Sequence, residues 1–292
     1  MTIIPAQQEN TSPQRAKQLR TAPSRVVVKL GTNVIMRPDG RVALGLLCGL
    51  VESIAAIRQS GIEVLLVSSG AIGLGMERLG MTRRPTEVPL IQACAATGQS
   101  RLMSLYDEAF ETMGCRIAQV LLTEDDFRDP VRHENLRATL RALLALGVIP
   151  IVNENDTVST VELDRPAASA DAPSSEARLF GDNDKLSALL LCHIEADLLV
   201  LLSDIDGLYD RHPGDPNAHL IADVSEITPE IRNYAHGGNG RGRGGMTSKL
   251  EAARIVMEAG RTAIIANGRT PRLLEKICAG EPVGTIFLPR SR

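Results

Sequence analysis

The sequence predicts an α/β fold, a three-layer αβα sandwich with a largely parallel central sheet. Short apolar, β-branched runs alternate along the chain with longer stretches of helical periodicity. Because a helix between two such runs joins parallel strands, this alternation places helices on both faces of one sheet. The chain has 292 residues, of which 43% are hydrophobic and 23% charged, which is enough to bury a sizeable core in an ordinary globular protein.

Each expected strand is a short apolar run, and five of the seven runs end in Gly or Asp. In the first part of the chain the expected elements are a strand at Arg25–Gly31, a helix at about Leu44–Gln59, a strand at Ile62–Gly70, a helix at about Pro89–Met113, the strand RIAQVLL, a helix at Arg132–Leu146 and the strand GVIPIVNEND. In the second part they are a helix at Leu186–Glu195, the strand ADLLVLLSDIDG, a helix at Ser248–Ala259 and the strands TAIIANG and VGTIFLPR.

Two segments do not fit this alternation. Residues 1–24 are polar and contain no apolar core of a signal peptide, so we expect a flexible N-terminal tail, with a partner-binding arm as the alternative. The stretch at 165–177, RPAASADAPSSEA, is rich in Ala, Ser and Pro and predicts a flexible surface insertion. The remaining chain, 25–292, is expected to form one α/β domain.

Charge and cysteine content exclude several classes of protein. The formal net charge is −3 and aromatic residues make up 2%, which argues against nucleic-acid binding. No apolar run approaches the roughly 18 residues that a membrane span needs. The five cysteines are scattered and form no CxxC pair, so we expect a reduced, cytoplasmic protein. The histidines show no metal-ligand spacing, and GAIGLG resembles a dinucleotide fingerprint only loosely.

The ends of the predicted strands carry the functional signal. Five of them end in small, polar or charged residues, reading KLGT, SSGA, NEND, SDIDG and ANG. A single such ending is ordinary turn chemistry. Because ligands of open parallel sheets bind at the carboxyl ends of the strands, five endings at one edge predict a binding site.

A glycine-rich loop runs directly into the last long helix. Six of the nine residues at 237–245 are glycine, and MTSK follows. Glycines let backbone N–H groups approach phosphate oxygens, and a helix N-terminus adds partial positive charge. The SKLE stretch fits a capping box and predicts a helix start at Thr247 or Ser248. Lys249 then lies in the first turn, which is unfavourable unless an anion is bound; the alternative is a plain Gly/Arg linker.

Lysine is scarce: the chain has only five among 32 basic residues, and Lys29, Lys185 and Lys249 fall in the candidate motifs. Lys29 ends a buried strand, so its ammonium needs a polar crevice. In FGDNDKLSALL, we expect Asn183 to act as a hydrogen-bonding group and Asp184 to hold the cationic side chains, the alternative being favourable charges near a helix start. In NENDTV, Asp156 is placed to accept from an ammonium group, and together with Ser69 it could bind an amino acid.

These motifs together resemble the amino acid kinase family, and within it the branch that phosphorylates glutamate. The resemblance runs from about Arg25 to the C-terminus, and its carriers are VVVKLGTNVI, VSSGAIGLG, ATGQSRL, VIPIVNENDTVST, GDNDKLSA, LLSDIDGLYD, GGMTSKLEAA and IIANG. It implies an amino acid kinase-like sandwich whose part up to about residue 180 binds glutamate and whose part from about 181 binds ATP. The implied reaction transfers the γ-phosphoryl group of ATP to the γ-carboxylate of L-glutamate, and the product feeds proline synthesis.

The resemblance also implies roles for individual residues. Lys29, Lys249 and Asp184 are the implied catalytic set, and Ser69, Asp156 and Asn183 the implied glutamate-binding set. The implied ATP-binding residues are Lys29, Ser203, Asp204, Arg243, Gly244, Gly245, Met246, Thr247, Ser248 and Lys249. Mg²⁺ is expected to arrive with ATP, without a direct protein ligand. Feedback inhibition by proline and assembly into a homodimer or homotetramer are further implications.

The sequence departs from the family pattern in three places. It ends at Arg292, directly after VGTIFLPR, so we expect no C-terminal RNA-modification-type (PUA) domain. The insertion at 165–177 lies near the implied glutamate site, where it is either inert or a lid. Arg243 stands where a small polar residue is common. Two other functions stay open: a kinase for another small carboxylate or carbamate on the same fold, and a nucleotide or amino-acid sensor without turnover.

Overall fold

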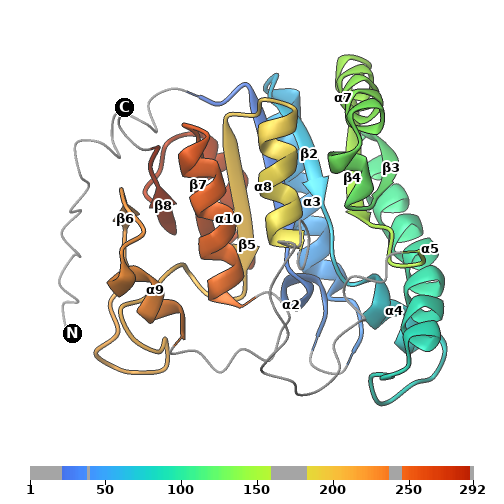
Figure 1. Ribbon diagram of the computed structural model, residues 1–292, viewed down its shortest axis with the longest axis horizontal. Coiled ribbons are helices and arrows are strands. Elements are labelled where there is room, and N and C mark those ends of the chain that lie inside the picture. Colours follow the sequence, from blue (N-terminus) through green and yellow to red (C-terminus); the bar gives the residue numbers. More distant parts are fainter. Residues whose placement is uncertain (1–21, 38–39, 159–182, 237–244, 290–292) are drawn as a thin grey trace.

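A single eight-stranded sheet forms the centre of the molecule. The computed structural model describes residues 22–37, 40–158, 183–236 and 245–289. The strand order is β3-β4-β2-β1-β5-β7-β8-β6 (Figure 1). β8 is antiparallel to β7, and the other neighbouring strands pair in parallel. The predicted largely parallel α/β sheet is therefore confirmed.

The strands are β1 (Arg25–Leu30), β2 (Glu63–Val67), β3 (Arg116–Leu122), β4 (Val148–Glu154), β5 (Leu198–Ser203), β6 (Asp223–Val224), β7 (Thr262–Asn267) and β8 (Thr285–Phe287). The helices are α2 (Thr32–Ile35), α3 (Leu44–Gln59), α4 (Ala71–Arg78), α5 (Val88–Thr112), α6 (Asp125–Arg128), α7 (Pro130–Ala145), α8 (Asn183–His193), α9 (Pro229–His236), α10 (Met246–Glu258) and α11 (Leu273–Cys278). The long elements match the predicted ones within a few residues. The short ones α2, α4, α6, α9, α11 and β6 were not predicted, because so few residues carry no readable period.

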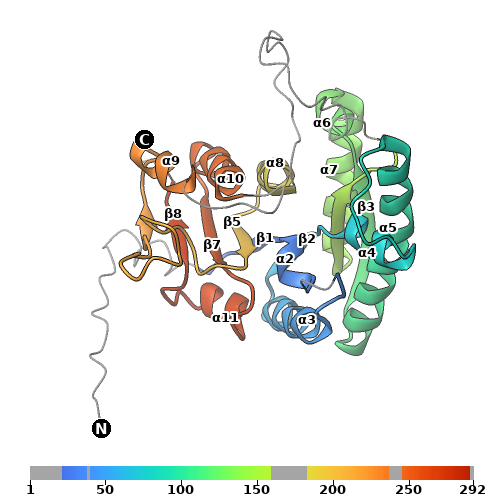
Figure 2. The ribbon, with the colours of Figure 1, turned by 90° about the horizontal axis from the view of Figure 1, so that it is seen from below.

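Helices cover both faces of the sheet, which gives the three predicted layers. Along β1 the side chains alternate, so Val26 and Val28 pack into one core and Val27 into the other. The first core lies under α3, α5 and α11, and the second under α7, α8 and α10. Figure 2 shows the two helical layers on opposite sides of the strands.

The two helices α4 and α5 cross at backbone contact. A Cβ atom on Gly75 would lie 1.8 Å from the carbonyl oxygen of Cys94, and one on Gly98 would lie 1.7 Å from that of Ala71. Neither position therefore admits a side chain. The GAIGLG stretch, which includes Gly75, forms the N-cap and the first turns of α4 and not a dinucleotide loop.

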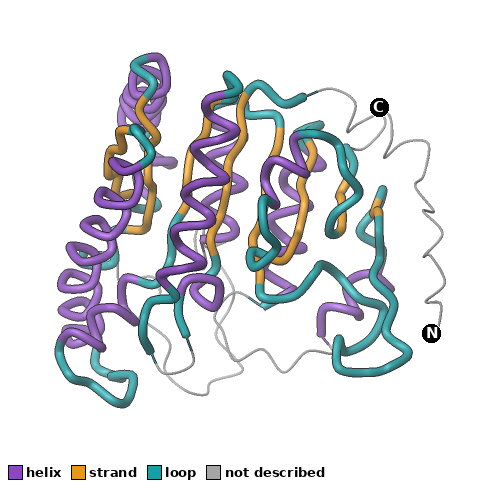
Figure 3. Tube along the Cα trace, turned by 180° about the vertical axis from the view of Figure 1, so that it is seen from behind, coloured by secondary structure: helices purple, strands orange, loops and turns teal. Residues whose placement is uncertain are grey.

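Five polar strand ends lie at one edge of the sheet, as the sequence predicted. The strands concerned, β4, β2, β1, β5 and β7, are consecutive neighbours and all parallel, so their carboxyl ends point the same way. Figure 3 shows the strands of the sheet side by side among the helices. Within the part of the chain that the structure describes, no helix is both long and apolar enough to span a membrane. Of the predicted features, residues 1–21 of the tail, the insertion at 165–177, and Arg243 and Gly244 lie outside the described residues.

Candidate active site

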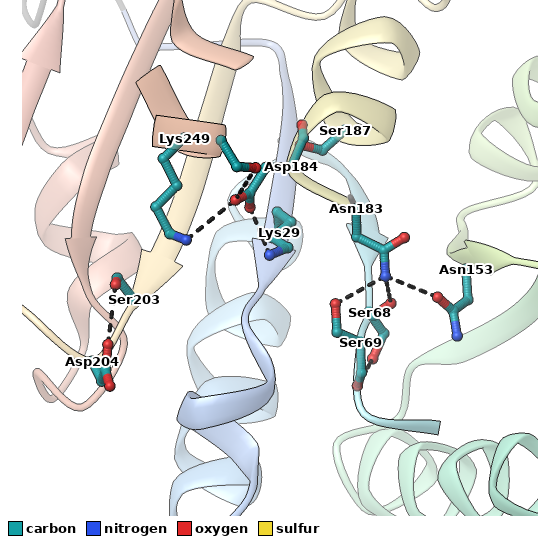
Figure 4. Close-up of polar contacts among 11 residues, drawn as sticks. Lys29, Ser68, Ser69, Asn153, Asn183, Asp184, Ser187, Ser203, Asp204 and Lys249 are labelled. Atoms are coloured by element: carbon teal, nitrogen blue, oxygen red, sulfur yellow. Dashed lines mark hydrogen bonds and ion pairs between the residues drawn. The ribbon is translucent and has the colours of Figure 1, made fainter. Parts of the chain in front are cut away.

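Two lysines from opposite ends of the chain meet at one buried carboxylate. Asp184, in the first turn of α8, is completely buried. The Nζ atom of Lys29 lies 2.6 Å from its Oδ1, and the Nζ atom of Lys249 lies 3.2 Å from its Oδ2 (Figure 4). The lysines are themselves only 3% and 5% exposed. We call Lys29, Asp184 and Lys249 the lysine cluster.

The charges in the lysine cluster favour an ionised carboxylate. Burial by itself would raise the pKa of Asp184, but the Lys29 and Lys249 ammonium groups and hydrogen bonds from Lys29 and Ser248 outweigh it, so the pKa is lowered. The two ammonium groups lie close together on one buried carboxylate. Ammonium groups are donors to anionic oxygens, so this cluster is suited to contact an anionic group.

Local structure places each member of the lysine cluster. Lys29 is the penultimate residue of β1, and Lys249 lies in the first turn of α10. The predicted capping box is wrong, because α10 begins at Met246 with Gly245 as its N-cap. The Ser248 hydroxyl does not cap the helix but donates to Oδ2 of Asp184 at 2.9 Å. The Ser248 side chain thus belongs to the surroundings of Asp184 and not to the cap of α10.

A second cluster lies one residue away, around the Asn183 side chain. The Nδ2 atom of Asn183 donates to the carbonyl oxygen of Ser68 at 2.9 Å, to Oγ of Ser69 at 2.9 Å and to Oδ1 of Asn153 at 3.0 Å (Figure 4). Ser68 and Ser69 follow β2 directly, and Asn153 is the penultimate residue of β4. We call Asn183, Ser68, Ser69 and Asn153 the amide cluster. It connects the ends of two strands to the start of α8.

The remaining predicted residues lie around these two clusters. Ser203 ends β5 and donates to Oδ1 of Asp204 at 3.3 Å, while Oδ2 of Asp204 accepts from Nδ2 of Asn33 at 3.2 Å. Gly245, Met246 and Thr247 form the N-terminal end of α10. Asp156 is partly exposed in the turn after β4. The structure thus joins Lys29, Asp184 and Lys249 in one group and Ser69 and Asn183 in another.

Several polar residues of the site were not singled out from the sequence. Asn153 lies inside the quoted NENDTV motif, and Asn33 lies inside VVVKLGTNVI, so the motifs held a signal for both. The hydroxyl of Tyr106, on α5, is 2.8 Å from Oγ of Ser68, and nothing in its sequence context points to that contact. Asn267, at the end of β7, donates to Oδ1 of Asp206 at 2.9 Å.

The chemistry of the clustered side chains suits contacts to phosphate oxygens. Among the described residues there is no group of three or more His, Cys, Asp or Glu that could hold a metal ion. Asp184, the buried carboxylate of the site, is already engaged by two lysines. Ammonium groups and a helix N-terminus are donors that recognise the oxygens of phosphate groups.

Comparison with known proteins gives concordant matches. The model of the family described as "Amino acid kinase family" matches residues 24–267. The chain is 48% identical over 264 residues to the glutamate 5-kinase of Gloeobacter violaceus, covering 90% of this chain and 68% of that protein. It is 45% identical over 265 residues to the glutamate 5-kinase of Lactiplantibacillus plantarum, covering 90% of this chain and 96% of that protein.

A solved structure supports the fold separately. The chain superimposes on an isopentenyl phosphate kinase with a TM-score of 0.59, covering 90% of this chain and 99% of that one at 18% identity. At that identity the likeness concerns the fold alone. The three-layer sandwich built from the sequence therefore has a counterpart among solved kinase structures.

Proposed function

The chain belongs to the amino acid kinase family, and from this premise we propose that it catalyses the glutamate 5-kinase reaction. It transfers the γ-phosphoryl group of ATP to the γ-carboxylate of L-glutamate, which is the first step of proline biosynthesis. Support comes from curated relatives at 43–48% identity that carry this name.

One observation carries the proposal on the structural side: a cluster of two lysines adjoins a cluster of neutral amides and hydroxyls. Asp184 holds both ammonium groups, and its chain neighbour Asn183 belongs to the amide cluster. The first cluster suits a phosphate and the second suits the polar end of an amino acid. Since the two are one residue apart, both substrates can be held at reacting distance.

The reaction requires little covalent chemistry from the protein. A glutamate carboxylate is already ionised near neutral pH, so it attacks the γ-phosphorus without a general base. The bond between the γ-phosphorus and the β,γ-bridging oxygen breaks, and the products are γ-glutamyl phosphate and ADP. What the protein supplies is positioning and compensation of negative charge as the phosphoryl group passes between two anions.

We propose that Lys29 and Lys249 contact the transferring phosphoryl group and that Asp184 holds them in place. Ser69, Asp156 and Asn183 bind glutamate, with Asn183 oriented by the strand ends described above. Ser203, Asp204 and the stretch 243–249 bind ATP, together with Lys29. This assignment divides the domain into a glutamate part up to about residue 180 and an ATP part from about 181.

Mg²⁺ is proposed to enter with ATP and to be held by its phosphate oxygens. Bound there, it would neutralise phosphate charge beside the lysine cluster. Three further proposals follow from family membership: proline competes at the glutamate site, the protein is a homodimer or homotetramer, and it acts in the cytoplasm. Added proline in the assay below, and light scattering of the purified protein, test the first two.

A hydroxylamine trap tests the proposed reaction directly. The purified protein is incubated with ATP, Mg²⁺ and either glutamate, aspartate, acetylglutamate or carbamate, and both hydroxamate and ADP are measured. We expect glutamyl hydroxamate and ADP in equal amounts with glutamate, and neither with the other acids. A glutamate-independent ADP rate, or a better rate with another acid, would contradict the proposal.

A further inference from the structure

The side chain of Gln99 contacts the amide cluster from outside, and neither cluster includes it. Gln99 lies on α5 within the GQSRL stretch. Its Oε1 accepts a hydrogen bond from Nδ2 of Asn153 at 2.9 Å. α5 thus makes a side-chain contact to the last residues of β4, at the edge where the substrates are proposed to bind.

A backbone group identifies which atom of the Asn153 amide is the oxygen. The N–H of Glu154 lies 2.9 Å from the Asn153 side chain, and an N–H can only donate, so the atom facing it is Oδ1. The Nδ2 atom therefore faces Gln99 and requires an acceptor there. Gln99 presents its carbonyl oxygen at that point, which satisfies this donor.

The orientation of Asn183 follows in the same way. The backbone carbonyl of Ser68 can only accept, so the atom of Asn183 that faces it is Nδ2. That same Nδ2 also faces Oδ1 of Asn153 and Oγ of Ser69, so its two hydrogens are shared among three acceptors. Since the Ser69 oxygen accepts from Asn183, its hydroxyl proton is left to donate elsewhere. The carbonyl oxygen of Asn183 is likewise turned away from these three partners.

We propose that Gln99 is a positioning residue for the glutamate substrate. It holds Asn153 in the orientation that accepts from Asn183, and through this relay it directs the Ser69 hydroxyl proton and the Asn183 carbonyl oxygen toward the substrate. A hydroxyl donor matches a substrate carboxylate, and an amide oxygen matches an α-ammonium group. This inference rests on the proposed function, because it assigns the amide cluster to glutamate.

The surroundings of Gln99 make the inference testable by substitution. Gln99 lines an open cavity of about 630 Å³ between α5 and β3, which Gln119 lines as well. Shortening or replacing either side chain therefore leaves no sealed void. Water entering from the cavity can restore part of the lost hydrogen bond, so the expected effect is moderate. No hydrogen bond joins Gln99 to the lysine cluster among the described residues, so ATP use should be spared.

The test compares three variants with the unaltered enzyme in steady-state kinetics. Gln99→Met keeps the length and loses the strong acceptor, whereas Gln99→Glu keeps an acceptor oxygen. Gln119→Met makes the same chemical change in the same cavity, at a side chain that makes no hydrogen bond to Asn153 among the described residues. The Gln99→Glu measurements are made at about 0.5 M salt, which screens the added charge. Thermal unfolding of each variant is followed in parallel.

We expect Gln99→Met to raise the KM for glutamate roughly 3- to 10-fold, as loss of one hydrogen bond would. The KM for ATP and kcat of Gln99→Met should stay within about twofold of the unaltered enzyme. Gln119→Met should have the kinetic constants of the unaltered enzyme. The KM for glutamate of Gln99→Glu should be closer to that of the unaltered enzyme than the KM of Gln99→Met is. An unchanged KM for glutamate in Gln99→Met, an equal rise for both substrates, or no rescue by Gln99→Glu would overturn the inference while leaving the kinase activity standing. Absence of glutamate-dependent turnover in the unaltered enzyme would instead remove the proposed function, and this inference with it.

Discussion

At the scale of single residues, Asp184 determines the character of the site. It is buried and accepts from Lys249 and Ser248 while pairing with Lys29, so each of its oxygens is used. An ammonium group that is held by a buried carboxylate has lost much of its freedom before substrate arrives. Preorganised charge of this kind stabilises a transition state without further rearrangement.

Replacing Lys249 with Met should therefore lower turnover with little change of fold. We expect kcat to fall by at least roughly 10²- to 10³-fold, because one preorganised cationic donor to the phosphoryl group is lost. Lys29 and Ser248 remain on the Asp184 carboxylate, so the helix start should persist. Initial rates at saturating glutamate and ATP measure the effect, and circular dichroism checks the fold.

Lys276→Met is the matched control, since this partly exposed lysine lies on α11, away from both clusters. Its turnover should equal that of the unaltered enzyme. Near-normal kcat in Lys249→Met would remove this lysine from the mechanism.

At the scale of elements, the crossing of α4 and α5 sets the position of α5 against the strand ends. α5 carries both Gln99 and the buried Tyr106, whose hydroxyl contacts Oγ of Ser68. Burial raises the pKa of the Tyr106 phenol, against the opposing effect of the Ser68 hydrogen bond, so the group stays neutral. The approach at Gly75 and Gly98 thus bears on the amide cluster, although neither glycine touches it.

Gly98→Ala should disturb the molecule strongly, because the new methyl group would overlap the Ala71 backbone. Overpacking of this kind lowers the free energy of unfolding by about 1–3 kcal/mol or more. Urea unfolding followed by circular dichroism measures the loss.

Gly45→Ala makes the same substitution in α3, where a Cβ would meet nothing within 4 Å. There it should raise the free energy of unfolding by about 0.5–1 kcal/mol, since alanine favours a helix. If both substitutions shifted stability in the same direction, the close crossing would not be what limits position 98.

At the scale of the whole molecule, α7 and α8 are joined by a histidine pair on the second helical layer. Nδ1 of His193 lies 2.8 Å from Nε2 of His133, and the Phe127 ring packs 5.9 Å from the His193 ring. Arg137 and Arg141 from α7 also face this point, and both pair with Glu195. Burial, then His133 and the two arginines, lower the pKa of His193 to about 4.

The His193 pair predicts a pH-dependent stability. A histidine with a usual pKa near 6.5 takes up a proton on unfolding below that pH, so the folded state loses stability as pH falls from about 6.5 to about 4. We expect the free energy of unfolding of His193→Gln to fall less over this range than that of the unaltered protein. Urea titrations across the range measure both slopes.

His212→Gln, a change at an exposed histidine, should keep the slope of the unaltered protein. Parallel slopes for all three proteins would show that His193 does not contribute to acid sensitivity.

Much of the fold could be predicted from the sequence, because buried parallel strands and long helices leave clear apolar patterns. The prediction that the polar strand ends share one edge of the sheet followed from the parallel arrangement of the strands. The predicted capping box was wrong: α10 begins at Met246, and the Ser248 hydroxyl donates to Asp184, which lies 64 positions away in the sequence. A local sequence pattern does not reveal a hydrogen-bond partner that is so distant in the sequence.

The contacts that only tertiary structure creates could not be predicted. Gln99 meets Asn153 across 54 positions, and Tyr106 meets Ser68 across 38, with no period or spacing that relates them. The close crossing at Gly75 and Gly98 was equally hidden, because a glycine-rich helix resembles a loop in sequence.

Asn183 and Asp184 are consecutive in the chain, and each serves a different cluster. The offset between the two clusters is therefore set by covalent geometry, with Cα atoms about 3.8 Å apart, and not by packing of separate elements. Packed elements drift by fractions of an ångström when distant residues mutate, whereas a peptide unit keeps its length. In the proposed reaction, the alignment of acceptor and donor molecules is thus buffered against sequence drift elsewhere in the protein, because a tilt of the α8 start would move both clusters together.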